Sequence, residues 1–208
     1  MDLSIQLKSL VISSAALCLA ALVWQVVRTL RFGWRPNPSV PSGSAAAGVF
    51  YAFGPGMAPW AKESARAHLP TWFAGVLYHL AVFTALALLG FHIFNFSLPS
   101  GAEWPVRGAL AFGLAAGLGL FIKRLISPAL VPISCPDDFA SNLMVDGFLV
   151  LALAASWGAA VAGFLIWGAA LLLYIPFGKI RHCFFFFYTR ILFGRFFGRR
   201  GVLPGGGE

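Results

Sequence analysis

Charged residues are scarce in this chain. Asp, Glu, Lys and Arg together make up 11% of its 208 residues, whereas a soluble domain contains roughly a quarter. Hydrophobic residues make up 59%, and the mean hydropathy is +0.82. So few charges cannot cover a water-exposed surface. The composition therefore excludes a disordered chain and an ordinary soluble enzyme, and it indicates a membrane protein.

Cysteines and acidic residues are also few. Cys18, Cys135 and Cys183 lie far apart without a CxxC or CxxCH motif, which excludes a secreted disulfide scaffold, a metal clip and covalent haem attachment. Lys and Arg number 15 against 7 acidic residues, a net charge of +8. The basic residues form short clusters between apolar runs. This pattern indicates membrane topology and no nucleic-acid partner, since a nucleic-acid binder carries a solvated basic stripe.

The first three apolar runs each predict a membrane-spanning helix, because about 20 apolar residues cross the hydrocarbon layer. The first extends over residues 9–27. We interpret it as a retained anchor, because most of its positive charge follows the run, unlike that of a signal peptide. The second covers residues 70–96 and begins at a proline, and the third covers residues 106–122.

The last apolar block, residues 147–178, contains no charge and is too long for one crossing. We expect a loop up to Asn142 before it and a tight hairpin turn within residues 156–163. The block then supplies a fourth and a fifth span. Two crossings fit this length only if the fifth helix continues through the CFFFFYT segment to Arg190.

The basic clusters orient the spans, because Lys and Arg concentrate in cytoplasmic loops. The clusters outside the tail are Arg28, Arg31, Arg35, Lys62, Arg66, Lys123 and Arg124. We therefore predict an all-α bundle of about five spans in the inner (cytoplasmic) membrane, with its N-terminus outside. An anchor (1–30) precedes a Pro-, Gly-, Ser- and Ala-rich cytoplasmic connector (31–68) without regular elements. A four-helix membrane bundle (69–192) and a basic tail (193–208) follow.

Ionisable residues inside a span are rare and indicate function. The candidates are His68, His79, His92 and His182. His79 lies nine residues after Pro70, about 14 Å along a helix, and His182 lies eight residues before Arg190, about 12 Å. With these markers at the inner boundary, both imidazoles stand at one level on antiparallel helices. That level suits a haem with two histidine ligands.

Haem propionates require nearby cations. Lys179, three residues before the last histidine, is expected on the same helix face, and Arg124 or Lys123 can reach the same level from the third span. The alternative is that these side chains only snorkel to the interface. Gly75, one turn before the histidine of the second span, either leaves room for the porphyrin edge or permits close helix packing.

The other two histidines receive different interpretations. His68 precedes the proline of the second span, and we expect an exposed cap at the interface. His92 lies near the outer end of that span and far round the helical wheel from His79. It either packs or contacts quinone, lipid or a partner subunit. The tail interleaves phenylalanines with arginines, which suits an interfacial helix or a docking surface.

Three motifs occur in order along the chain: LYHLA around His79, KRLISP at residues 123–128, and PFGKIRH ending at His182. Together they resemble the haem b (gamma) subunit of respiratory nitrate reductase and its relatives in sulfite reductase-linked and heterodisulfide reductase-like membrane complexes. The similarity covers roughly residues 72–190. It implies an N-out, five-helix protein that passes electrons between the quinone pool and an iron-sulfur partner subunit on the cytoplasmic face.

The chain departs from this family at the outer side of the membrane. The family's gamma subunits hold two haems, and two of the expected histidine positions are Leu89 and Phe164 here. The long outer loop before the fifth span is also missing. We therefore expect one haem b on the cytoplasmic side and no outer haem, with His92 as an alternative ligand to a cofactor from another chain.

Three functions compete at this point. The favoured one is an electron-transfer subunit with one haem b between His79 and His182, quinone as a diffusible partner and no catalytic residue of its own. The second is a cofactor-free membrane anchor or assembly subunit of such a complex. The third, a small transporter, ranks last because such proteins use acidic or paired charged residues within their spans. Here Asp146 is the only acidic residue near one.

Overall fold

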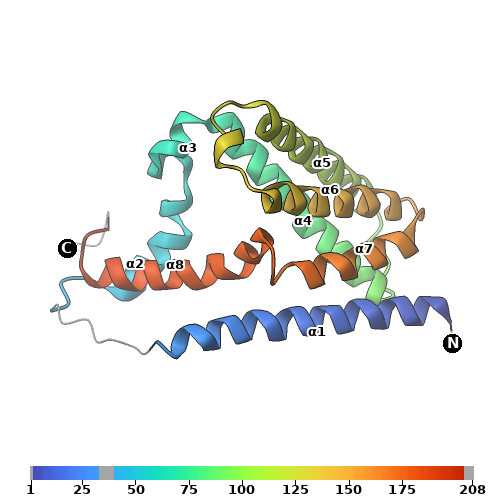
Figure 1. Cartoon of the computed structure of the whole chain (residues 1–208), viewed down its shortest axis with the longest axis horizontal. Helices are drawn as coiled ribbons and strands as arrows, with labels where there is room; N and C mark the ends of the chain where they lie inside the picture. Colours follow the sequence, from blue (N-terminus) through green and yellow to red (C-terminus); the bar gives the residue numbers. More distant parts are fainter. Residues whose placement is uncertain (1, 33–39, 204–208) are drawn as a thin grey trace. The chain divides into compact units, whose positions relative to one another are not determined.

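The computed structural model describes residues 2–32 and 40–203 (Figure 1). Its elements are α1 (Leu3–Leu30), α2 (Ala45–Phe53), η1 (Pro55–Met57), η2 (Pro59–Ala61), α3 (Glu63–Ala67), α4 (Leu69–Phe94), α5 (Glu103–Ile126), η3 (Val131–Ile133), α6 (Pro136–Ala155), α7 (Val161–Tyr174), η4 (Lys179–Arg181) and α8 (His182–Arg199). The chain divides into two compact units, residues 1–21 with 73–180 and residues 22–72 with 181–208. Arg35, which we assigned to the connector, lies outside the described residues.

The predicted all-α membrane bundle is confirmed. Helices α1, α4, α5 and α6 are long and apolar enough to cross a membrane, and α7 with α8 supplies a fifth span if the pair is counted as one interrupted crossing. The described part of the chain contains no strand. The protein is therefore a multi-pass membrane protein.

The core of the first unit lies among α4, α5, α6 and α7, and Figure 1 shows α5 beside α6. Leu110, Phe148 and Phe164 are fully buried there. Helices α4 and α5 touch where Gly113 faces Ala81: a Cβ added to Gly113 would lie 2.1 Å from the Cβ of Ala81. Small residues at this crossing permit the close approach on which packing in membranes depends.

The hairpin between the fourth and fifth spans is confirmed, whereas the loop predicted before it is too long. The turn occupies residues 156–160, with Gly158 at φ 78°, in the left-handed region that favours glycine. Helix α6, however, begins at Pro136 and not after Asn142. Proline suits the first turn of a helix, and the Asp138 carboxylate accepts the N–H of Cys135 at 2.9 Å. This cap starts the helix earlier than its apolar run suggests.

The predicted continuous fifth helix is wrong. Helix α7 ends at Tyr174, and α8 begins at His182. Pro176 has no N–H to extend the helix. Asp137 fixes the turn that follows α7. Its carboxylate accepts a hydrogen bond from the Tyr174 hydroxyl and another, at 2.8 Å, from the backbone N–H of Lys179.

The connector is more ordered than its composition predicts, and our expectation that it forms no regular element is wrong. In the second unit α2 packs along α8, and Figure 1 shows the two side by side. Ser44 caps α2 by accepting the N–H of Ala47 at 3.3 Å. A Cβ on Gly48 would lie 2.1 Å from the carbonyl oxygen of Gly194 and 2.5 Å from the Cα of Gly198. Glycine lets the two backbones touch, which a local sequence pattern does not reveal.

Candidate functional site

His79 lies on α4, one of the predicted spans, and its side chain is exposed on the first unit. Its Nδ1 lies 2.6 Å from the carbonyl oxygen of Gly75, one turn earlier. A carbonyl only accepts, so Nδ1 carries the proton of this hydrogen bond and Nε2 carries the lone pair. Metal-binding histidines commonly use this arrangement, in which one ring nitrogen donates to a backbone carbonyl.

Gly75 has open space around it. A Cβ added to this residue meets no atom within 4 Å. Among the two alternatives for Gly75, close packing therefore has no support within the described residues. The space beside the exposed His79 imidazole remains compatible with a porphyrin edge.

His182 is the first residue of α8, in the second unit, and its side chain is exposed. The neighbouring Lys179 lies in η4 and not on the helix of His182. The expectation that the two share one α-helical face is therefore wrong, because the chain turns between α7 and α8. Each of the two histidines proposed as haem ligands thus belongs to a different unit.

The cations predicted to lie at one level, Arg124 and Lys179, meet at Asp138. The Lys179 ammonium lies 2.6 Å from Oδ2 of Asp138, and the Arg124 guanidinium lies 3.4 Å from Oδ1. Arg124 also donates to the Ser134 hydroxyl at 3.2 Å. The ends of α5 and α6 and the turn η4 thus form a cation cluster, in which two cations share one carboxylate.

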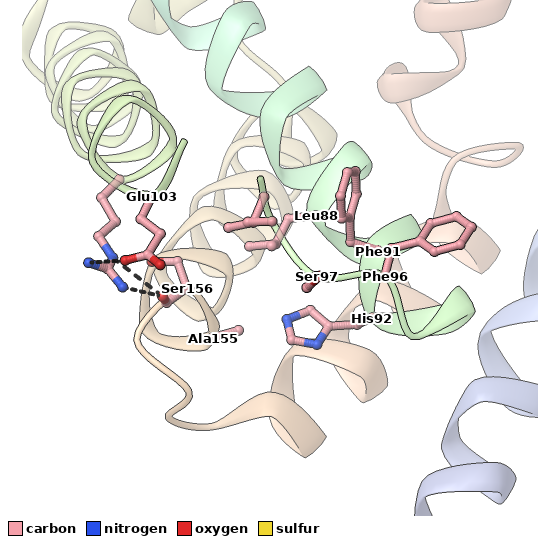
Figure 2. Close-up of a pocket in the computed structure, with 10 residues that line it drawn as sticks. Leu88, Phe91, His92, Phe96, Ser97, Glu103, Ala155 and Ser156 are labelled. Atoms are coloured by element: carbon pink, nitrogen blue, oxygen red, sulfur yellow. Dashed lines mark hydrogen bonds and ion pairs between the residues drawn. The ribbon is translucent and has the colours of Figure 1, made fainter. Parts of the chain in front are cut away.

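The other end of the first unit contains a pocket of about 280 Å³ (Figure 2). Its wall contains Leu88, Phe91, His92, Phe96, Ser97, Leu98, Glu103, Arg107, Ala155 and Ser156. Figure 2 shows the His92 imidazole reaching in from α4, with Glu103 and Ser156 on the other side. The Nε2 atom of His92 is buried and has no hydrogen-bond partner among the described residues. A buried ring nitrogen of this kind favours a polar ligand atom.

Arg107 fixes the far wall of this pocket. Its guanidinium lies 3.7 Å from Glu103 and donates to the carbonyl oxygen of Ser156 at 2.9 Å. It also stacks over the Trp157 ring, 3.7 Å from the ring centroid. These contacts tie the start of α5 to the hairpin turn after α6. Our sequence reasoning overlooked Arg107, although its spacing of four residues from Glu103 is a recognisable helical ion pair.

Apolar side chains fill the two positions at which the sequence comparison with the resembled family expected further histidines. Leu89 is 4% exposed and Phe164 is 0% exposed. Phe164 stacks on Phe148 with ring centroids 5.1 Å apart, and Leu89 packs 3.2 Å from the position of a Cβ on Gly168. His92 contacts the edge of Phe164, at 5.9 Å between ring centroids. Apolar side chains of the chain therefore fill the core of the bundle at the level of Leu89 and Phe164.

Our sequence reasoning also missed a group of hydrogen-bonded polar side chains inside the bundle. The Tyr78 hydroxyl on α4 donates to Asp146 on α6 at 2.7 Å, and the Asn142 amide donates to the other carboxylate oxygen at 3.2 Å. We noted Asp146 only as an acidic residue near a span. The i, i+4 spacing from Asn142 was an available signal, whereas the Tyr78 contact depends on how two distant helices meet.

The excess positive charge lies in the second unit. By sequence the first unit contains five basic and five acidic residues, whereas the second contains ten basic and two acidic ones. Burial and the neighbouring Arg190 lower the pKa of Lys62. Arg190 of α8 lies over the Phe186 ring at 5.5 Å, and Arg200, which follows α8, lies over the Phe196 ring at 3.4 Å. This unit therefore offers a basic and aromatic surface.

His68 ends α3 in the second unit, where its N–H donates to the carbonyl oxygen of Ala65 at 3.2 Å. Its side chain is exposed. This placement agrees with the expected cap at a helix boundary.

The chain matches no protein-family model, and no curated protein or solved structure shows detectable similarity to it. The functional conclusion therefore depends on the residues and their geometry.

Proposed function

We propose that this protein is a cytochrome b-type subunit of a respiratory membrane complex, which transfers electrons between the quinone pool and an iron-sulfur partner. In this proposal His79 and His182 would hold one haem b through its iron. The observation that carries it is the His79 imidazole, which lies on a membrane span with Nδ1 held by Gly75 at 2.6 Å. Nε2 then has the lone pair that iron requires.

The residues present fit a haem. The open space at Gly75 would leave room for a porphyrin edge, and Arg124 and Lys179, which pair with Asp138, would also be cations for the propionates. Bound haem would supply a one-electron carrier, and the chain's own residues hold and orient it. The packed core at Leu89 and Phe164 supports one haem per chain, because these side chains fill the level where the resembled nitrate reductase family places its second haem.

The pocket at His92 supports quinone as the diffusible partner. Its walls combine apolar side chains with a buried imidazole nitrogen that needs a polar ligand atom. A quinone offers a flat ring and carbonyl oxygens, which suit such a pocket. In this proposal the His92 Nε2 forms a hydrogen bond with a quinone oxygen.

The positive charge of the second unit supports both an iron-sulfur partner subunit and the proposed orientation in the membrane. The unit's net positive charge of eight supports a cytoplasmic position by the positive-inside rule, which agrees with the proposed N-terminus outside and inner-membrane location. An iron-sulfur subunit with an acidic surface would dock on this face through the arginines and phenylalanines of α8.

The test is reduction of the purified protein by a short-chain quinol, followed as the appearance of the reduced b-type absorption band. We expect the wild-type protein to be reduced by quinol and by dithionite. His92→Ala should retain the dithionite-reduced band but react with quinol at least about tenfold more slowly, because one hydrogen bond to the substrate is lost.

His68→Ala is the matched control, because this exposed histidine lies outside the pocket. It should behave as the wild type does. A protein that shows no b-type band after expression with ample haem would favour the cofactor-free anchor instead. A normal rate of reduction by quinol in His92→Ala would contradict the assignment of this pocket as the quinone site.

A further inference from the structure

Asp146 is the one acidic residue in the described part of the chain with a buried side chain, at 4% exposure. It lies midway along α6, a predicted membrane span. Burying a carboxylate in a membrane is costly unless it is paired, so such residues are rare and mark proton or ion sites.

The groups around Asp146 are neutral hydrogen-bond donors. Tyr78 donates to Oδ1 at 2.7 Å and Asn142 to Oδ2 at 3.2 Å. From α5 the carboxyl group faces Gly117, where a Cβ would lie 2.6 Å from Oδ1. Arg107 pairs with Glu103, and Arg124 and Lys179 pair with Asp138. The two donors favour the ionised carboxylate, and burial without a cation favours the protonated acid.

No full charge on the neighbouring helices decides between these two forms. On α5 the cations Lys123 and Arg124 lie near the helix end, and Arg124 pairs with Asp138. Helix α7 contains no charged residue, and its Tyr174 bonds Asp137 and Ser141. In α1 the Lys8 ammonium donates to Asn95, after the end of α4. A change of one charge near Tyr78 can therefore shift the protonation of Asp146.

Polar side chains on α6 lie between the cation cluster and Asp146. Asp138, Asn142 and Asp146 follow one another at intervals of four residues, so they lie along one face of α6. Asn142 bonds Asp146, and Asp138 takes part in the cluster with Arg124 and Lys179. Both ends of this stripe are carboxyl groups, and the stripe extends to the end of the bundle where α6 begins.

We infer that Asp146 is an intramembrane proton-binding site, which takes up one proton when an electron enters the haem held by His79. The inference rests on the proposed function, in which His79 holds the haem. Tyr78 links the two sites, because it bonds Asp146 and adjoins His79 in α4. The electron comes from quinol or another reductant, and the proton comes from water through the stripe on α6. Asp146 changes from carboxylate to carboxylic acid, and no other bond forms or breaks. The proton thereby balances the negative charge that the electron adds, in a medium that screens charge poorly.

The test is a redox titration of the haem in the purified protein at several pH values. In the wild type the midpoint potential should fall as pH rises, by up to about 59 mV per pH unit, the value for one proton per electron. In Asp146→Asn, which keeps the shape and the acceptor for Tyr78, the potential should be independent of pH. Glu63→Gln, which changes an exposed carboxylate on α3 in the second unit, should keep the wild-type dependence.

A second readout does not involve turnover. The reduced-minus-oxidised infrared spectrum of the wild type should show a carboxylic acid C=O band that shifts in D2O and disappears in Asp146→Asn. If that variant does not fold, Tyr78→Phe gives the test. Loss of one donor to the carboxylate should tighten proton binding about tenfold and move the pH-dependent range up by about one unit.

The outcomes separate the two proposals. A protein with haem, a pH-independent potential and no carboxyl band overturns the assignment of Asp146 and leaves the electron-transfer function standing. A protein that binds no haem overturns both. A wild-type pH dependence that survives in Asp146→Asn assigns the proton to another group and overturns the inference.

Discussion

Replacing either His79 or His182 with alanine should abolish the b-type absorption band. Each change removes one of the two axial ligands, and a b-type haem has no covalent bond to hold it. The band should fall from a full signal to background in the reduced-minus-oxidised spectrum of the purified protein. His68→Ala and His92→Ala should keep it, since neither residue is a ligand in this account.

Rescue distinguishes a lost ligand from a lost fold. His79→Gly leaves space for free imidazole, which should restore the band when added at millimolar concentration, whereas a misfolded chain would not respond. Helical content, measured by circular dichroism, should match that of the wild type. A normal band in His79→Ala, or a band lost in His68→Ala, would show that the ligands are assigned wrongly.

Gly48→Ala should separate α2 from α8. The new methyl group would lie 2.1 Å from the carbonyl oxygen of Gly194, so the two backbones must move apart. Alanine favours a helix over glycine by about 1 kcal/mol, but overpacking of this kind costs roughly 1–3 kcal/mol or more. We expect a net loss of about 2 kcal/mol. Amide hydrogen exchange across residues 45–53 should therefore accelerate about 30-fold.

Gly119→Ala is the matched control for this prediction. Gly119 is also helical, and a Cβ there meets no atom within 4 Å. The same chemical change should leave exchange in residues 45–53 unaltered and, if anything, stabilise α5. Equal exchange rates in Gly48→Ala and the wild type would contradict the packing of α2 on α8.

The spans follow from the sequence because apolar length is a local property. Residues 70–96 and the hairpin at residues 156–163 are predicted close to α4 and to the observed turn. The start of α6 is not, because a proline and the Asp138 cap extend it beyond its apolar run. Helix α2 escapes prediction for another reason: its glycines matter only against α8, about 140 residues further along the chain.

The candidate site is only partly predictable for the same reasons. Arg124 and Lys179 are expected at one level, and the structure brings both to Asp138, a residue we placed in a loop. The local Glu103 and Arg107 spacing was readable but overlooked. By contrast, the Tyr78–Asp146 bond joins α4 to α6 and depends on helix packing. Sequence periodicity cannot specify which tyrosine meets which carboxyl group.

The most direct test of the proposed function is the haem content of the purified full-length protein, measured as pyridine haemochrome against protein concentration. The account predicts about one haem b per chain, because His79 and His182 supply a single pair of ligands. A protein without haem after expression with ample haem would contradict the electron-transfer function. Two haems per chain would contradict the packed core at Leu89 and Phe164 as the reason for a single site.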